Sequence, residues 1–128
     1  MAINILVVDD SAVMRSMIKK TIRSSNLDVG DIHEAANGQE GLDVLSQNWL
    51  DLLFIDVNMP VMDGIEMLTR VRENPETSDM PVLIVSTESN NERIKLIHSK
   101  KAGFVHKPFT PEKLKESILT QLGVLVAC

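Results

Sequence analysis

The chain has 128 residues, of which 44% are hydrophobic and 24% are charged, and its formal net charge is −5. This size and composition are typical of one globular domain with a core of its own. The negative charge argues against a nucleic-acid-binding surface. No apolar run is long enough to span a membrane, and Ile3–Val8 is too short for a signal peptide. A single cysteine, Cys128, excludes an internal disulfide and favours a reducing compartment. We therefore expect a cytoplasmic protein with no nucleic-acid or membrane partner.

Five predicted strands alternate with five predicted helices along the chain. Near-continuous apolar runs predict buried strands at Ile3–Val8, Leu52–Ile55 and Val82–Val85, and weaker strands are expected at 29–36 and 104–106. This alternation specifies an α/β fold in which helices cover both faces of a parallel sheet. Right-handed crossovers give a doubly wound sheet, for which 2-1-3-4-5 is one of two common strand orders.

The predicted helices follow from helical spacing of apolar residues and from capping residues. Ser11, Asn37 and Thr110 are expected N-caps. Trp49 is expected to cover the end of the second helix, near Asn48. The apolar positions of the five helices, in chain order, are Val13, Met14, Met17, Ile18 and Ile22; Leu42 and Leu45; Ile65, Leu68 and Val71; Ile94 and Ile97; and Leu114, Ile118 and Leu122.

Polar residues with recognisable chemistry follow four of the predicted strands. In an open parallel sheet, ligands bind at the carboxyl ends of the strands, near the point where the strand order reverses. These residues are Asp9 and Asp10 after the first strand, Asp56 after the third, Ser86 and Thr87 after the fourth, and Lys107 after the fifth.

The three acids predict a metal site. The first and third strands are neighbours in the expected order, and two carboxylates about 4 Å apart repel by roughly 4 kcal/mol at an effective dielectric of about 20. A hard divalent cation with oxygen ligands relieves that repulsion, and Mg²⁺ suits an open acidic site. We expect carboxylates from Asp10 and Asp56 and a backbone carbonyl near Asn58 as ligands, with Asp9 in support.

Asp56 is also a candidate nucleophile. A carboxylate that attacks phosphorus forms an aspartyl phosphate, and no separate base is needed because the carboxylate is already ionised. Lys107 lies two strands away, at roughly 10 Å, and its long stem is expected to bring its ammonium to the new phosphoryl group. The hydroxyl of Ser86 is expected to hydrogen-bond that group.

Four segments together resemble the bacterial response-regulator receiver domain: Val8–Ser11, Asp56–Gly64, Ser86–Thr87 and Lys107–Phe109. The resemblance covers essentially the whole chain and is to the stand-alone, CheY-like type associated with chemotaxis. It implies a flavodoxin-like fold and a single receiver domain over residues 1–128 with no effector domain.

The resemblance also implies a mechanism. Asp56 would accept a phosphoryl group from a histidine kinase in a Mg²⁺-dependent reaction. The domain itself would assist both this phosphorylation and the later dephosphorylation. The chain would therefore be a phosphoacceptor switch and not a classical enzyme. Ser86 and Phe104 would be the switch residues, the latter where the family often has tyrosine. The output face would consist of the fourth helix, fifth strand and fifth helix, and its target would be a protein such as a flagellar motor switch component. The expected state is a monomer, or a dimer when phosphorylated.

Three further expectations concern single segments. The resemblance implies a cis peptide at Lys107–Pro108, and it gives Asn58 and Glu88 an influence on how fast water attacks the phosphorylated aspartate. The apolar residues 124–128 either pack back on the domain or favour self-association.

Other functions remain as alternatives. A phosphorelay intermediate or a kinase-regulating receiver outside chemotaxis would use the same chemistry. A Mg²⁺-dependent phosphatase with an aspartate nucleophile is disfavoured, because such enzymes carry D-x-D after the first strand, whereas Asp9 and Asp10 are adjacent. The phosphate-binding glycine motifs of nucleotide-binding proteins are absent from the sequence. An acidic first loop and few aromatic residues argue against a flavin.

Overall fold

The computed structural model describes residues 2–25, 27–87, 89–107 and 109–122. The expectations for Glu88, Pro108 and residues 124–128 lie outside these ranges. A five-stranded parallel sheet with the order β2-β1-β3-β4-β5 forms the centre, which confirms the predicted fold class. In chain order the elements are β1 (Ile3–Val8), α1 (Ala12–Arg23), β2 (Val29–Ala35), α2 (Gly38–Gln47), β3 (Leu52–Ile55), α3 (Gly64–Glu73), β4 (Val82–Ser86), α4 (Asn91–Ser99), β5 (Gly103–His106) and α5 (Pro111–Gln121).

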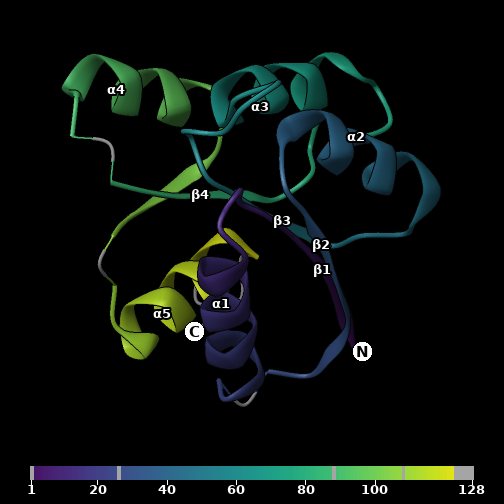
Figure 1. Ribbon diagram of the computed structural model, residues 1–128, viewed down its shortest axis with the longest axis vertical. Coiled ribbons are helices and arrows are strands. Elements are labelled where there is room, and N and C mark those ends of the chain that lie inside the picture. The colour runs from purple at the N-terminus through teal and green to yellow at the C-terminus, as the bar shows by residue number, and fades with distance from the viewer. Residues whose placement is uncertain (1, 26, 88, 108, 123–128) are drawn as a thin grey trace.

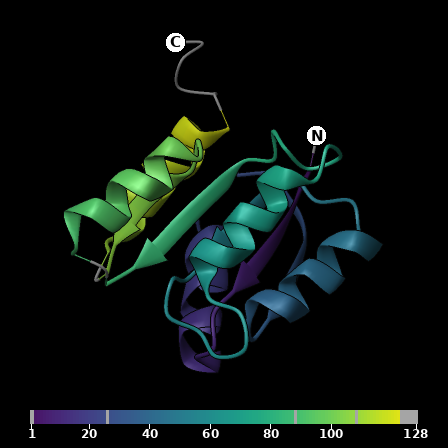
Figure 2. The ribbon, with the colours of Figure 1, turned by 90° about the horizontal axis from the view of Figure 1, so that it is seen from above.

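The helices form two layers, one on each face of the sheet. Figure 1 shows α1 and α5 below the sheet and α2, α3 and α4 above it, and Figure 2 shows the same layers from above. Each layer encloses its own apolar core, one containing Ile18 of α1 and Leu114 of α5, the other Leu68 of α3 and Ile97 of α4. Among the helices of the described residues, none is both long and apolar enough to cross a membrane.

The central strand β3 is buried on both faces. All four residues of Leu52–Ile55 are at most 1% exposed, because β1 and β4 flank the strand and helices cover it above and below. Its side chains alternate between the two cores. This burial explains why the strand reads as a continuous apolar run in the sequence.

The helix starts agree with the predicted capping residues. The side chains of Ser11, Asn37 and Thr110 each accept a hydrogen bond from a backbone N–H in the first turn of the helix that follows. Asp63 caps α3 in the same way, because its side chain accepts a hydrogen bond from the Glu66 N–H.

Two apolar side chains of α1 lie outside its buried face. Val13 is 75% and Met17 49% exposed, whereas Ile18 and Ile22 are buried. Each exposed residue precedes an inward-facing one by a single position, which is a rotation of about 100° around the helix. The helical spacing was therefore predicted correctly, but the buried stripe is narrower than the sequence suggested.

The prediction for Trp49 is wrong. Its side chain is 85% exposed and covers little of α2, while its neighbour Leu50 is only 6% exposed. Successive residues of an extended segment point to opposite sides, so the chain entering β3 can bury only one of the two.

Candidate functional site

The three predicted acids meet at the carboxyl end of the sheet. Val8 of β1 pairs with Ile55 of β3, so the residues that follow, Asp9 and Asp56, leave the sheet side by side. The Asp56 N–H donates to the Val8 carbonyl at 2.9 Å. Asp9, Asp10 and Asp56 each offer a carboxylate oxygen within 4.8 Å of the other two. Asp9 and Asp56 are 1% and 8% exposed, whereas Asp10 is exposed.

Lys107 reaches this acid cluster, as the sequence predicted. Its backbone N–H donates to the Ser86 carbonyl at 2.8 Å, which continues the β4–β5 pairing by one residue and fixes where the side chain begins. The ammonium Nζ lies 3.1 Å from Asp9 Oδ2 and 3.6 Å from Asp56 Oδ1. The closer partner is therefore Asp9, a pairing that strand positions alone did not indicate.

The carboxylate of Asp56 is held by one of its oxygens. Oδ1 accepts the Val57 N–H at 2.9 Å, and among the described residues none donates a hydrogen bond to the other oxygen. Burial raises the pKa of Asp56 above its usual 3.8; Lys107 lowers it, and the negative charges of Asp9 and Asp10 raise it further. An additional positive charge at the cluster would favour the ionised form.

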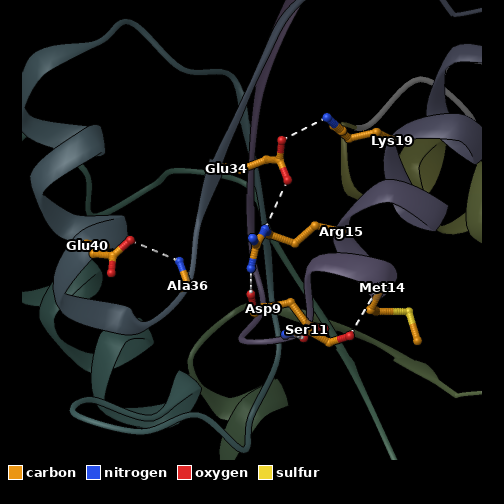
Figure 3. Close-up of polar contacts among 8 residues, drawn as sticks. All are labelled: Asp9, Ser11, Met14, Arg15, Lys19, Glu34, Ala36 and Glu40. Atoms are coloured by element: carbon orange, nitrogen blue, oxygen red, sulfur yellow. Dashed lines mark hydrogen bonds and ion pairs between the residues drawn. The ribbon is translucent and has the colours of Figure 1, made fainter.

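Asp9 is fixed by contacts to both its side chain and its backbone. Its Oδ1 accepts the Ser11 N–H at 2.9 Å, so the first loop folds back on the carboxylate. Arg15 Nη1 donates to the Asp9 carbonyl at 2.6 Å, from the first turn of α1 (Figure 3). This contact of Arg15 cannot be predicted from the sequence, because helical spacing shows only that its side chain leaves the apolar face.

An ion-pair network extends from this contact to β2. Arg15 Nε donates to Glu34 Oε1 at 2.9 Å, and Lys19 Nζ donates to Glu34 Oε2 at 2.8 Å (Figure 3). The hydrogen bond from Lys19 lowers the pKa of Glu34. The network thus ties α1 to β2 beside the acid cluster and brings a second cation, the Arg15 guanidinium, to the backbone of Asp9.

The loop that follows Asp56 returns closely onto it. A Cβ at Gly64 would collide with the Asp56 carbonyl group, so only glycine fits, and the Gly64 N–H donates to the Val57 carbonyl at 2.9 Å. The other side of the loop is tied to α2, because the Gly38 N–H donates to the Met62 carbonyl at 3.0 Å. These contacts limit how far Asp56 can move.

The remaining predicted site residues are Ser86 on β4, Asn58 in the loop after Asp56, and Phe104 on β5. Ser86 is completely buried at the end of β4, and Asn58 is exposed in the loop after Asp56. Phe104 is half-buried, pairs with Ile84 across the β4–β5 ladder and packs on the core beneath α3 and α4. Its ring centroid lies 6.2 Å from that of His106.

The chemistry of the cluster follows from these contacts. Three carboxylates within 4.8 Å of each other form a group that can hold a hard metal ion. In one of them, Asp56, Oδ1 accepts the Val57 N–H and lies 3.6 Å from the Lys107 ammonium, while the other oxygen accepts no hydrogen bond from the described residues. A carboxylate in this setting can attack an electrophile that carries negative charge, provided that a cation balances the charge.

The response regulator receiver domain model matches residues 5–119, and the chain belongs to this family. Receiver domains bind Mg²⁺ in an acidic pocket and act as signalling switches, not as classical enzymes.

Within that family the similar proteins are CheY-like. The chain is 41% identical over 123 residues to the chemotaxis protein CheY homolog of Campylobacter jejuni, which covers 93% of this chain and 92% of that protein. It is 37% identical over 123 residues to the chemotaxis protein CheY1 of Helicobacter pylori, with 93% and 96% covered. The crystal structure of CheY4 from Vibrio cholerae has 31% identity and a TM-score of 0.83, covering 94% of this chain and 98% of that one. The chain is therefore a CheY-like receiver domain, as its motifs indicated.

Proposed function

We propose that the chain is a response regulator that accepts a phosphoryl group on Asp56 from a histidine kinase and signals by altered partner binding. The observation that carries the proposal is the setting of Asp56. Its carboxylate ends the central strand, stands within 4.8 Å of two other carboxylates and lies 3.6 Å from the Lys107 ammonium. An acid in this environment is costly unless cations and a charged substrate are part of its function.

The donor set fits Mg²⁺. All three side chains that converge are carboxylates, and oxygen ligands are those that Mg²⁺ prefers. Asp10, Asp56 and the backbone carbonyl of Asn58 would hold the ion, with Asp9 in support. When bound, the ion would supply positive charge to the oxygens of the phosphoryl group.

The transfer step uses the ionised carboxylate directly. An oxygen of Asp56 attacks the phosphorus of a phosphohistidine, the new O–P bond forms and the P–N bond breaks. The electron pair of that bond stays on the histidine nitrogen, which takes up a proton from solvent. The charge at Asp56 grows from one negative charge to about two, and Lys107 would turn from Asp9 to a phosphoryl oxygen. Attack by water on the same phosphorus would later restore the carboxylate.

The output side of the proposal involves Ser86 and Phe104. The Ser86 hydroxyl would hydrogen-bond the phosphoryl group, and the accompanying movement of its loop would let Phe104 turn inward. Both changes would shift an existing equilibrium on the face that α4, β5 and α5 form. Phenylalanine carries no hydroxyl, so its readout would rest on ring packing alone.

We assign this switch to chemotaxis in the cytoplasm, because the two curated relatives described above are both named as chemotaxis proteins. The downstream target would be a protein such as a flagellar motor switch component, and the chain would be a monomer or, when phosphorylated, a dimer. A phosphorelay role would instead require transfer of the phosphoryl group from Asp56 to a second histidine protein. Capture of partners by the phosphorylated form separates these two roles.

The decisive experiment mimics the phosphorylated state. Beryllofluoride and Mg²⁺ added to the purified protein should shift the amide NMR signals of Asp10, Asp56, Ser86, Phe104 and Lys107. Asp56→Asn should abolish these shifts, and omission of Mg²⁺ should do the same.

The matched control is Asp63→Asn, the same substitution in the same loop. Asparagine caps a helix as well as aspartate does, so this variant should respond like the parent protein. A parent protein that does not respond, or an Asp56→Asn variant that does, would contradict the proposal. Incubation with acetyl phosphate should add one phosphoryl group per chain by intact mass; repeated turnover of the ester would instead indicate a phosphatase.

A further inference from the structure

Arg15 lies beside the acid cluster and is held there by two contacts. Its side chain is only 17% exposed; Nη1 donates to the Asp9 carbonyl at 2.6 Å and Nε donates to Glu34 Oε1 at 2.9 Å (Figure 3). Because a guanidinium is planar and rigid, two contacts in different directions fix its orientation. Lys19 donates to the second oxygen of Glu34 at 2.8 Å and so holds that carboxylate from its other side.

The carbonyl that Arg15 contacts belongs to the peptide that leads into Asp10. A peptide unit is planar, so a contact that fixes the Asp9 carbonyl also fixes the N–H and the Cα atom of Asp10. The next peptide is held as well, because the Ser11 N–H donates to Asp9 Oδ1 at 2.9 Å. Asp10 therefore stands between two fixed peptides, one held by Arg15 and the other by the side chain of Asp9.

The carboxylate of Asp10 has no comparable support of its own. It is exposed, and among the described residues none donates a hydrogen bond to it. Asp9 and Asp56, in contrast, are buried, and each accepts a backbone N–H and has the Lys107 ammonium within 3.6 Å. An oxygen of Asp10 nevertheless lies within 4.8 Å of both other carboxylates. Its position in the cluster thus depends on the backbone that carries it.

We propose that Arg15 is a positioning residue for the Mg²⁺ site: it clamps the Asp9–Asp10 peptide so that the Asp10 carboxylate faces Asp56. This inference rests on the proposed function, which assigns Asp10 and Asp56 to the ion. Glu34 anchors the guanidinium and keeps its donors on the backbone of Asp9 and away from the carboxylates that hold the ion. Groups in the outer shell of a metal site orient the ligands, and their loss weakens metal binding by about 10- to 100-fold.

The clamp does not depend on Lys107. In the proposed transfer step, the Lys107 ammonium turns from Asp9 Oδ2 to the phosphoryl group. The contacts of Asp9 with Arg15 and with the Ser11 N–H use its carbonyl and its Oδ1 instead. They therefore keep the first loop in place after the lysine has turned away.

Charge and geometry predict opposite effects of removing Arg15. A cation near three carboxylates repels Mg²⁺, so a purely electrostatic role would make Mg²⁺ binding tighter when the charge is removed. Loss of the clamp would make it weaker. Arg15→Lys keeps the charge but replaces the planar fork with a single ammonium, which cannot hold the Asp9 carbonyl and Glu34 in the same geometry. Arg15→Met removes the charge and the donors together.

Titration with Mg²⁺, followed by amide NMR shifts, gives the dissociation constant for the parent and for each variant. Arg15→Lys and Arg15→Met should both bind Mg²⁺ at least about 10-fold more weakly than the parent. Arg23→Lys and Arg23→Met are the matched controls, since they change an exposed arginine in the last turn of α1, and they should leave the constant unchanged. Unchanged binding in both Arg15 variants, or tighter binding in Arg15→Met, would overturn the inference alone. A parent protein without Mg²⁺-dependent shifts would contradict the proposed function and this inference with it.

A second measurement needs no metal. Relaxation of the ¹⁵N nuclei in the presence of a chelator reports how well each amide is ordered. The Asp10 and Ser11 amides should have order parameters of about 0.85 in the parent, as in a rigid backbone, and should fall toward about 0.6 in the Arg15 variants. The Asp56 amide, which donates to the Val8 carbonyl, should stay rigid in all of them. Equal order at Asp10 in parent and variants, or an equal loss at Asp10 and Asp56, would show that Arg15 does not act as a local clamp.

Discussion

Asp56→Asn tests the electrostatics of the acid cluster most directly. At 4.8 Å and an effective dielectric of about 20, each carboxylate pair repels by about 3.5 kcal/mol. The attraction between Asp56 and Lys107, at 3.6 Å, is about 4.6 kcal/mol on the same scale. Two repulsions, from Asp9 and Asp10, therefore exceed one attraction by about 2 kcal/mol, and burial of the charge acts in the same direction. Asparagine removes all of these terms and keeps an acceptor for the Val57 N–H.

We expect the substitution to raise the free energy of unfolding by about 2 kcal/mol at neutral pH, in low salt and without divalent cations. Urea unfolding in the presence of a chelator measures this, with Asp31→Asn on exposed β2 as the control that should change little. A variant equal to or less stable than the parent, with an unchanged control, would refute the reasoning.

The pH dependence of this difference has a defined sign. The pKa of Asp56 is raised in the folded state, so the fold favours the protonated acid and the ionised form is the destabilising one. The greater stability of the asparagine variant should therefore be fully present at a pH above the raised pKa of Asp56. It should disappear as the pH falls below 3.8, the pKa of aspartate in the unfolded chain. Mg²⁺ should act in the opposite direction: at 100 times its dissociation constant it would stabilise the parent by about 2.7 kcal/mol and cancel the difference.

Three further substitutions probe contacts beside the site and in the fold that carries it. Glu34→Gln should lower the free energy of unfolding by at most about 1 kcal/mol, because the partners of Glu34 on α1 are partly exposed. The pKa of Glu34 is lowered in the folded protein, so this loss should be complete above pH 4.5 and should vanish as the pH falls through the lowered pKa. Urea unfolding across this pH range measures the loss. Gly64→Ala should lower the free energy of unfolding by about 1–3 kcal/mol and weaken beryllofluoride binding in NMR titrations, because the alanine Cβ would displace the Asp56 carbonyl. Unchanged binding would contradict the close approach of Gly64 to the Asp56 backbone. Arg72→Met should lower the free energy of unfolding by about 2 kcal/mol or more in the same assay, because the guanidinium donates to the carbonyls of Met80, Lys100 and Lys101. A loss below about 0.5 kcal/mol, which is typical of a surface substitution, would show that water replaces these hydrogen bonds.

The sequence predicted most of the fold because its strongest signals are also its physical causes. Leu52–Ile55 reads as a buried strand because it is covered on both faces, and the acids follow strands whose carboxyl ends lie at one edge. Given the strand order, the meeting of Asp9 with Asp56 needs no further information.

The parts that the sequence did not reveal depend on the direction of individual side chains. Helical spacing showed that Arg15 leaves the apolar face of α1 but not that it donates to the carbonyl of Asp9, which depends on how α1 is placed over the sheet. Trp49 and Leu50 are both large and apolar, and hydrophobicity cannot tell which of them turns inward. The positive φ of Val61, at 68°, is likewise unexpected for a β-branched residue.

The register of β4 and β5 connects the acid cluster to the proposed output face over a very short path. Ser86 is opposite His106, its carbonyl accepts the Lys107 N–H at 2.8 Å, and Phe104 pairs with Ile84 two residues earlier. A movement of Ser86 toward a phosphorylated Asp56 would therefore act on the backbone from which Lys107 reaches the same group, and on the strand that carries Phe104. No long chain of intermediaries is required, because both switch residues belong to one ladder. The two residues should accordingly respond together in NMR, with shifts that follow a single transition as beryllofluoride is added.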